Sequence, residues 1–233
     1  MRKEKFVSVI IAAAGKGKRM NSHINKQYLN IGEKPVLAHT IEVFNKCSFI
    51  DEIIVVTHPD EVAYCKEKVI NFFGLEKVTK VVAGGKERQE SIFNGLKAVY
   101  QKCDIVVIHD GARPFVREEY ILKSIDEAIK HKAVGVGVPV KDTIKVVDEE
   151  KNIKNTLNRN VLWAIQTPQT FDYQLLLRAH KKAIEDGYLG TDDTVLVERL
   201  GEKVRMLMSS YDNIKITTPE DLYIGEAILR NRK

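Results

Sequence analysis

The segment Phe6 to Met20, FVSVIIAAAGKGKRM, decides the fold of the chain. Val7 to Ile11 is a short apolar run typical of a buried parallel strand, and it leads through three alanines into a Gly-X-Gly turn. Gly15 and Gly17 permit backbone conformations that expose successive N–H groups, and the neighbouring lysines and Arg19 add positive charge. The segment therefore predicts a strand followed by a loop that binds a polyphosphate.

The loop matches neither of the two common phosphate-binding fingerprints. A dinucleotide-binding loop has a third glycine three residues after the second, where this chain has Met20. A P-loop places Ser or Thr directly after its lysine, but Lys16 is followed by Gly17. The loop by itself therefore indicates anion binding, and an ordinary strand-to-helix turn stays an alternative.

The composition is that of a globular protein. Apolar residues make up 44% and charged residues 30% of the 233 residues, which excludes disordered, collagen-like and transmembrane classes. The net charge of +5 is spread along the chain, without a basic run interleaved with aromatic residues or a nucleic-acid-binding motif. We therefore expect one domain over residues 1–233 that binds an anionic small molecule, and neither nucleic acid nor a membrane.

The cysteines and the N-terminal segment both indicate the cytoplasm. Cys47, Cys65 and Cys103 are far apart and lack metal-ligand spacing, as expected of free thiols in a reducing compartment. The basic residues before Val7 imitate a secretory signal, but the apolar run is short, lacks leucine and continues directly into GKGKRM. We therefore interpret this segment as a strand and expect a cytoplasmic protein.

Strand and helix patterns alternate along most of the chain. Apolar or β-branched runs at 53–57, 78–83, 105–109 and 133–140 are separated by helical patterns, which predicts an α/β fold with a mainly parallel sheet. Further predicted segments are a turn at 166–171, strands at 204–208 and 214–217, and helices at 91–100, 117–130, 173–185 and 219–230.

Residues 141–163 break this alternation. They form a polar pattern in which β-branched residues flank a charged turn near 149–152, as in a β-hairpin. A two-stranded ribbon this polar cannot belong to a core, and it gains stability by packing on another surface. We therefore predict a protruding β-arm that contacts a second subunit.

Candidate ligand-binding residues follow the predicted strands, whose carboxyl ends meet at one edge of a parallel sheet. The pair Gly84-Gly85 ends one strand, and Asp110 ends another, where it could hold a divalent cation, cap the next helix or pair with Arg113. Lys26 lies on a linker next to the phosphate loop, and the sequence by itself favours an ordinary solvated lysine there. His109 has no second histidine at ligand spacing, so we interpret it as structural.

Seven local motifs, taken together, resemble one family. They are AAAGKGKRM, NKQYL, GGKERQES, HDGARP, KDTIK, NRNVLWAIQTPQTF and NIKITTPEDL. In order and spacing they resemble the IspD-type cytidylyltransferases of isoprenoid biosynthesis, from the first strand to the last helix. The resemblance implies a Rossmann-like three-layer α/β sandwich of the nucleotidyltransferase type. It also implies transfer of CMP from CTP to 2-C-methyl-D-erythritol 4-phosphate, with release of pyrophosphate, by a magnesium-dependent homodimer.

The resemblance also implies roles for individual residues. Arg19, Lys26 and Lys215 would stabilise the transition state, and Asp110 would lie near the ribose and the metal. Lys215 suits this role because it alternates with two isoleucines in NIKIT and so points away from their face. The residues implied to bind CTP are Ala13, Ala14, Gly15, Gly17, Gly85, Arg88, Ser91 and Asp110.

The acceptor, by the same resemblance, would be held partly by the arm of the other subunit. Thr143 and Arg159 are the arm residues implied, and Arg159 suits a phosphate because its guanidinium can bind two oxygens at once. Arg113, Thr167 and Thr191 are further candidates for the acceptor site. Some family members carry an acidic residue where this chain has Lys86, so Lys86 is assigned no role.

Other functions stay open from the sequence. A ribitol-5-phosphate cytidylyltransferase shares the fold and the QTPQ and NIKITTP motifs, although NRNVLW favours the methylerythritol branch. A sugar-1-phosphate nucleotidyltransferase that uses UTP or GTP is expected to be longer. A non-catalytic nucleotide-binding module would tolerate the loss of Lys26 or Lys215, whereas an enzyme would lose turnover.

Overall fold

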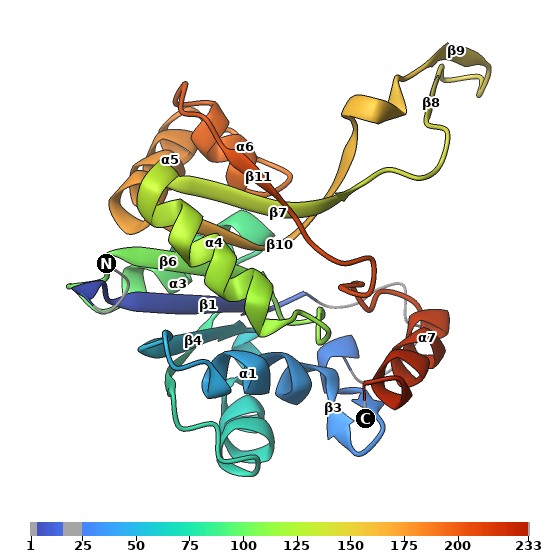
Figure 1. Ribbon diagram of the computed structural model, residues 1–233. Coiled ribbons are helices and arrows are strands. Elements are labelled where there is room, and N and C mark those ends of the chain that lie inside the picture. Colours follow the sequence, from blue (N-terminus) through green and yellow to red (C-terminus); the bar gives the residue numbers. More distant parts are fainter. Residues whose placement is uncertain (1–3, 16–24, 233) are drawn as a thin grey trace.

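A seven-stranded sheet forms the centre of the computed structural model, which describes residues 4–15 and 25–232 (Figure 1). The strand order is β11-β7-β10-β6-β1-β4-β5, and β10 runs antiparallel to both of its neighbours while the other pairings are parallel. The predicted α/β fold with a mainly parallel sheet is therefore confirmed. The strands are β1 (Val7–Ala13), β4 (Glu52–Thr57), β5 (Val78–Ala83), β6 (Ile105–Asp110), β7 (Ala133–Pro139), β10 (Trp163–Asp172) and β11 (Arg205–Met208).

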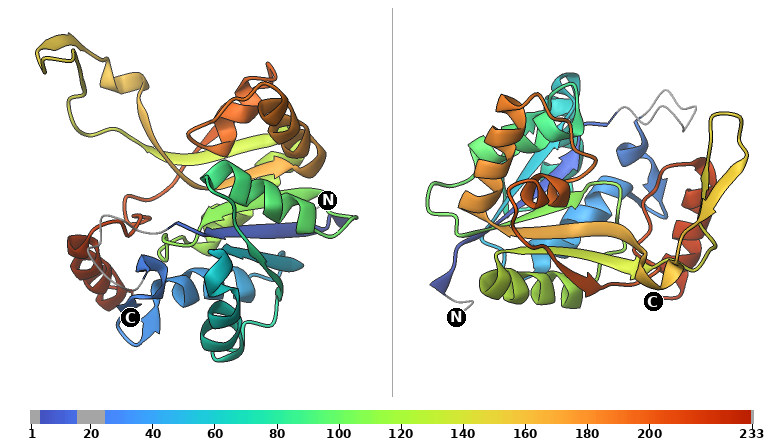
Figure 2. Two further views of the ribbon diagram at one scale, coloured as in Figure 1. Left: turned by 180° about the vertical axis from the view of Figure 1, so that it is seen from behind. Right: turned by 90° about the horizontal axis from the view of Figure 1, so that it is seen from above.

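Helices cover both faces of this sheet and produce three layers (Figures 1 and 2). In β1, Val9 and Ile11 pack on the face covered by α1 (Val36–Lys46) and α4 (Glu118–His131). Ile10 points to the other face, which α3 (Arg88–Ala98), α5 (Tyr173–Glu185) and α6 (Asp193–Glu198) cover. Because a strand buried on both faces carries apolar side chains in both directions, β1 reads as a continuous apolar run.

A smaller apolar cluster lies beside the main sheet. The short strands β2 (Asn30–Ile31) and β3 (Lys34–Pro35) pair with each other, and α7 (Pro219–Arg230) packs on them through Leu222 and Leu229. Gly225 of α7 is required there, because a Cβ at this position would lie 2.9 Å from Ile31 Cδ1. The remaining short elements are η3 (Lys26–Tyr28), η4 (Pro59–Glu61), α2 (Val62–Tyr64), η5 (Cys65–Asn71) and η6 (Arg159–Val161).

The predicted arm is a hairpin that extends away from the sheet (Figure 1). Strands β8 (Lys145–Val147) and β9 (Ile153–Thr156) pair antiparallel, and every residue in both strands is exposed. The hairpin therefore agrees with the sequence, while its contact with a second subunit stays a prediction.

Two predicted segments are wrong. The predicted turn at 166–171 is part of strand β10, whose pairing with β7 is interrupted between Ile165 and Gln169. Pro168 lies in this interruption, where its missing N–H costs no ladder hydrogen bond. The predicted strand at 214–217 is irregular chain instead, since Thr217 N donates to the Asp221 carboxylate as part of the cap of α7.

Helix α3 begins at Arg88, earlier than the predicted start at Ser91, and this places Arg88 in its first turn.

No helix in the described ranges is long and apolar enough to cross a membrane.

Candidate active site

A cleft lies at the carboxyl edge of the parallel strands. The chain after β1, the loop after β5 and Asp110 at the end of β6 meet there, as expected for ligand sites of open parallel sheets. Gly17 and Arg19 lie outside the described residues. The predicted residues that line the cleft are Ala13, Ala14, Gly15, Lys26, Gly85, Arg88, Ser91, Asp110 and Lys215.

The short helix η3 places Lys26 at this cleft. The neighbouring Gln27 is buried, and its Nε2 donates to Ala13 O over 2.8 Å. The Tyr28 hydroxyl forms a 2.9 Å hydrogen bond with Thr57 Oγ1 at the end of β4. These two contacts attach η3 to the ends of β1 and β4. Lys26 therefore lies on a fixed element, and not on a freely solvated linker.

Ser91 organises the glycine loop after β5. Its hydroxyl donates to Glu87 O over 3.0 Å and accepts a 3.1 Å hydrogen bond from Gly85 N. The backbone of Gly84 is tightly enclosed, because a Cβ there would lie 2.5 Å from Ala14 Cβ. The loop therefore packs directly against the chain that follows β1, and the two segments form one wall of the cleft.

Three cationic side chains surround Asp110, which is buried apart from one edge. Lys215 Nζ lies 2.8 Å from Oδ2, Arg113 Nε lies 3.4 Å from Oδ2, and Arg88 Nε lies 3.5 Å from Oδ1. Burial alone would raise the pKa of the Asp110 carboxyl, but the three cations outweigh this effect and hold the pKa well below its usual range. Asp110 is therefore ionised at neutral pH, and the cleft combines one carboxylate with several positive charges.

Comparison with known proteins identifies the family of this chain. The family model described as IspD, 2-C-methyl-D-erythritol 4-phosphate cytidylyltransferase, matches residues 7–231. The chain belongs to the IspD family. A 2-C-methyl-D-erythritol 4-phosphate cytidylyltransferase of Caldanaerobacter subterraneus subsp. tengcongensis is 54% identical over 224 residues, which cover 96% of this chain and 99% of the relative. One of Clostridioides difficile is 54% identical over 226 residues, or 97% and 94% of the two chains.

Solved structures agree with this assignment. A crystal structure of 4-diphosphocytidyl-2C-methyl-D-erythritol synthase from Anaerococcus prevotii is 37% identical, with a TM-score of 0.86, and the match covers 98% of this chain and 97% of that one. A 2-C-methyl-D-erythritol 4-phosphate cytidylyltransferase from Thermus thermophilus is 31% identical with a TM-score of 0.81 over 97% and 99% of the two chains. The resemblance to the IspD family that the sequence motifs carried is thus confirmed.

In this IspD-family chain, Lys215 is positioned by the residues on either side of it. Asn213 is buried, and its Nδ2 donates to Thr167 O over 2.8 Å in strand β10. Ile216 N donates to Ala112 O over 2.8 Å, and the Ile216 side chain is buried. Lys215 therefore points to the opposite side, toward Asp110, as the alternating sequence predicted.

The structure separates the predicted acceptor residues into two groups. Arg113 and Thr167 lie next to Asp110, since Arg113 contacts its carboxylate and Thr167 Oγ1 accepts a 3.1 Å hydrogen bond from its backbone N–H. Thr143 and Arg159 are exposed on the arm, where Arg159 Nη1 donates to Lys141 O over 2.9 Å. Thr191 is exposed just before α6. Their roles stay predictions.

His109 lies behind Asp110 and is fully buried, in agreement with a structural role. Its Nδ1 is 3.0 Å from Thr167 Oγ1 and its Nε2 is 3.1 Å from Arg113 O. Since the Arg113 carbonyl can only accept, Nε2 carries the proton of the neutral ring, and Nδ1 accepts from the Thr167 hydroxyl. Burial lowers the pKa of His109 to about 4, so the ring is neutral at physiological pH.

The donor set at Asp110 fits Mg²⁺ that is shared with a nucleotide. Residues 4–15 and 25–232 contain no group of three or more His, Cys, Asp or Glu side chains arranged to hold a metal. Mg²⁺ usually binds through one or two carboxylates together with substrate phosphates and water. A single ionised carboxylate that faces the cleft meets this requirement.

Sequence reasoning missed four residues of this region. Gln27 and Lys86 line the cleft, although neither was assigned a role. Asp193 and His180 connect to the cleft through Arg88, which donates to Asp193 over 2.7 Å. The contact between residues so distant in sequence is visible only in the fold.

Proposed function

We propose that this chain transfers CMP from CTP to 2-C-methyl-D-erythritol 4-phosphate and releases pyrophosphate, at the cleft around Asp110. The observation that carries the proposal is the convergence of Lys26, Lys215 and Asp110 beside the glycine-containing chain after β1, in a member of the IspD family. CTP is bound along the segments after β1 and β5, and the acceptor approaches from the side of Arg113 and Thr167.

The reaction requires positive charge more than it requires a base. The nucleophile is a phosphate monoester, whose second pKa is about 6, so it is already a dianion at neutral pH. The imidazole next to Asp110, that of His109, is buried and makes two hydrogen bonds inside the protein. Catalysis therefore rests on positioning and on cations that stabilise the charge developing around the α-phosphorus.

The side chains divide this work by their position. Lys26 and Lys215, with Arg19, hold the oxygens of the α-phosphate as a fifth oxygen approaches the phosphorus. Asp110 would hold Mg²⁺, with the nucleotide phosphates as its other ligands. When bound, Mg²⁺ neutralises part of the phosphate charge and fixes the geometry of the triphosphate. Lys215 exchanges its contact with Asp110 for the substrate during binding.

The working form is a homodimer in the cytoplasm. Every residue of the two arm strands is exposed in the single chain, including Val147 and Ile153, which favours a partner surface that the arm can pack against. Arg159 of each arm then reaches the acceptor phosphate in the other subunit. All three cysteines are buried free thiols, in keeping with a reducing compartment.

Pyrophosphate release by the purified protein tests the proposed reaction. The protein is incubated with CTP and Mg²⁺, and methylerythritol 4-phosphate is compared with ribitol 5-phosphate as the acceptor. We expect release only with methylerythritol 4-phosphate, much less with UTP in place of CTP, and none after EDTA. Release only with ribitol 5-phosphate would overturn the acceptor assignment and leave the CTP site intact. Release with neither would overturn the proposed reaction.

A further inference from the structure

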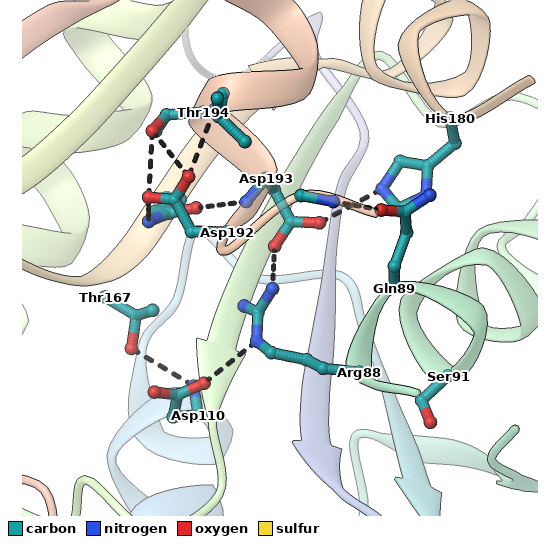
Figure 3. A network of polar contacts seen from close by, with 12 residues as sticks. Arg88, Gln89, Ser91, Asp110, Thr167, His180, Asp192, Asp193 and Thr194 are labelled. Carbon is teal, nitrogen blue, oxygen red and sulfur yellow. Dashed lines mark hydrogen bonds and ion pairs between the residues drawn. The ribbon is translucent and has the colours of Figure 1, made fainter. Parts of the chain in front are cut away.

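Arg88 lies between two carboxylates that belong to different parts of the fold (Figure 3). Its Nη1 is 2.7 Å from Asp193 Oδ2, whereas its Nε is 3.5 Å from Asp110 Oδ1. Asp110 faces the cleft, and Asp193 is the first residue of α6 with a side chain only 1% exposed. The guanidinium is thus held tightly on the buried side and only loosely on the cleft side.

His180 fixes the other oxygen of Asp193. His180 is fully buried in α5, and its Nε2 is 3.0 Å from Asp193 Oδ1, so the ring donates to the carboxylate. Burial alone would raise the pKa of Asp193, but Arg88 and His180 outweigh it and hold the pKa below its usual range. Both oxygens of Asp193 are therefore committed, one to Arg88 and one to His180.

The backbone around Asp193 is also fixed from two sides. Asp193 N donates to Gln169 Oε1 over 3.1 Å, and Gln169 lies in the middle of strand β10. Gly190 N donates to Gln89 Oε1 over 2.8 Å, and Gln89 follows Arg88 in α3. Because the sheet and α3 both hold this segment, Asp193 is a rigid anchor for the guanidinium.

We propose that Asp193 and His180 are positioning residues that keep Arg88 beside Asp110 without allowing it to close on that carboxylate. An arginine without such an anchor forms a bidentate pair with a nearby carboxylate. Closure of that kind would occupy both oxygens of Asp110 and compete with the Mg²⁺ of the CTP complex. The anchor keeps Arg88 Nε at 3.5 Å from Asp110 Oδ1, so a bidentate pair does not close on this carboxylate. This inference rests on the proposed function, because it assigns a role to Asp110 in that reaction.

The test compares CTP binding with and without Mg²⁺ by titration calorimetry. A neutral side chain in Asp193→Asn holds Arg88 less strongly, since charge-assisted hydrogen bonds contribute more than neutral ones. The quantity compared is the gain from Mg²⁺, which is the ratio of CTP affinity with Mg²⁺ to CTP affinity without it. We expect this gain to fall about tenfold in Asp193→Asn, because one charge-assisted hydrogen bond contributes on this scale. The gain that Mg²⁺ provides isolates the role of the Asp110 carboxylate, because a direct contact between Arg88 and CTP would change the affinities with and without Mg²⁺ alike.

Asp192→Asn is the matched control. Asp192 precedes Asp193 and caps α6 by accepting from Val195 N. It also accepts from Gln169 Nε2, but the ion pairs of Arg88 are with Asp110 and Asp193. This variant should lower the melting temperature while the gain from Mg²⁺ equals that of the wild type. A merely structural role for Asp193 would make the two variants behave alike. A gain from Mg²⁺ that is unchanged in Asp193→Asn, or absent from the wild type, would overturn the proposal.

A second pair of variants tests the His180 contact. His180→Phe removes the donor to Asp193, and we expect about a threefold to tenfold loss of the same gain. His180→Gln keeps an N–H donor, so most of the gain from Mg²⁺ should be retained in this variant. Equal behaviour of the two variants would contradict the role given to His180. If the gain from Mg²⁺ depends on Asp193 but no acceptor releases pyrophosphate, the proposed function fails and the positioning role stands.

Discussion

Lys215 Nζ lies 2.8 Å from Asp110 Oδ2, although the two residues are 105 positions apart in the sequence. The lysine side chain is 37% exposed and the aspartate side chain 9% exposed, so the pair lies at the boundary between the protein interior and the cleft. Because solvent can still reach the lysine, its ion pair can open without a large desolvation cost. In the proposed mechanism this contact is the resting state, and it opens when CTP binds.

Replacement of either cleft lysine should reduce turnover far more than nucleotide binding. We expect Lys215→Ala and Lys26→Ala each to lower kcat by about a hundredfold or more, the scale for loss of one transition-state donor. Binding of CTP, measured by calorimetry, should stay within about tenfold of the wild type. Lys123→Ala, at an exposed position of α4, is the control with unchanged kinetics. Retained turnover in both cleft variants would contradict the mechanism and favour a binding module.

Loss of the arm arginine should affect one substrate only. Arg159 is exposed on the arm and is held by its hydrogen bond to Lys141 O. If it binds the acceptor phosphate of the other subunit, Arg159→Ala should raise KM for methylerythritol 4-phosphate by tenfold or more, about the value of one charged hydrogen bond. KM for CTP should hardly change.

The exposed lysine of the neighbouring strand provides the control for this variant. Lys154→Ala removes a positive charge from β9 of the same arm and should leave both KM values unaltered. An equal rise of KM for both substrates in Arg159→Ala would count against a role of the arm in acceptor binding.

Gly84→Ala should weaken CTP binding through the backbone. The added Cβ would lie 2.5 Å from Ala14 Cβ and 2.8 Å from Ser91 Oγ, so the two segments that form the wall of the cleft must separate. We expect at least about a tenfold loss of CTP affinity, because small displacements of binding groups are costly.

Gly95→Ala separates this effect from a general loss of stability. Its Cβ would lie 2.7 Å from Ile10 Cγ2 in the core, and overpacking of this kind costs about 1–3 kcal/mol. Both variants should therefore have a lower melting temperature, but only Gly84→Ala should lose CTP affinity. Comparable loss of CTP affinity in both would show that the cleft wall has no particular role.

The sequence predicted most of the sheet but mistook β10 for a turn. An apolar run such as Val7–Ile11 is enough to predict a strand, because a strand buried on both faces carries apolar side chains in both directions. β10 instead carries buried polar residues, among them Gln166 and Gln169, whose hydrogen-bond partners lie far away in the sequence. A local pattern cannot show that such groups are satisfied in the core, so the segment resembled an exposed turn.

The same limit applies to the site. Lys215 and Asp110 were recognisable through their motifs, and the cleft does bring them together. The pair formed by Asp193 and His180 was not recognisable, since it depends on how α5 and α6 pack beside α3. Motifs thus indicated which residues face the ligand, while the fold was needed to show which residues hold them in place.

His109 should make the stability of the protein depend on pH. Burial lowers its pKa from the ordinary 6.5 to about 4, so the unfolded chain binds this proton more readily than the folded protein. The contribution is fully present above pH 6.5 and is lost as the pH falls toward 4, which amounts to about 3 kcal/mol. Denaturant unfolding at several pH values between 7 and 4 should show this loss in the wild type. His109→Gln should be less stable at pH 7, but its free energy of unfolding should change less with pH over that range. His131→Gln, at the exposed end of α4, should show the same pH dependence as the wild type. A wild-type slope in His109→Gln would refute the assignment of a buried neutral imidazole.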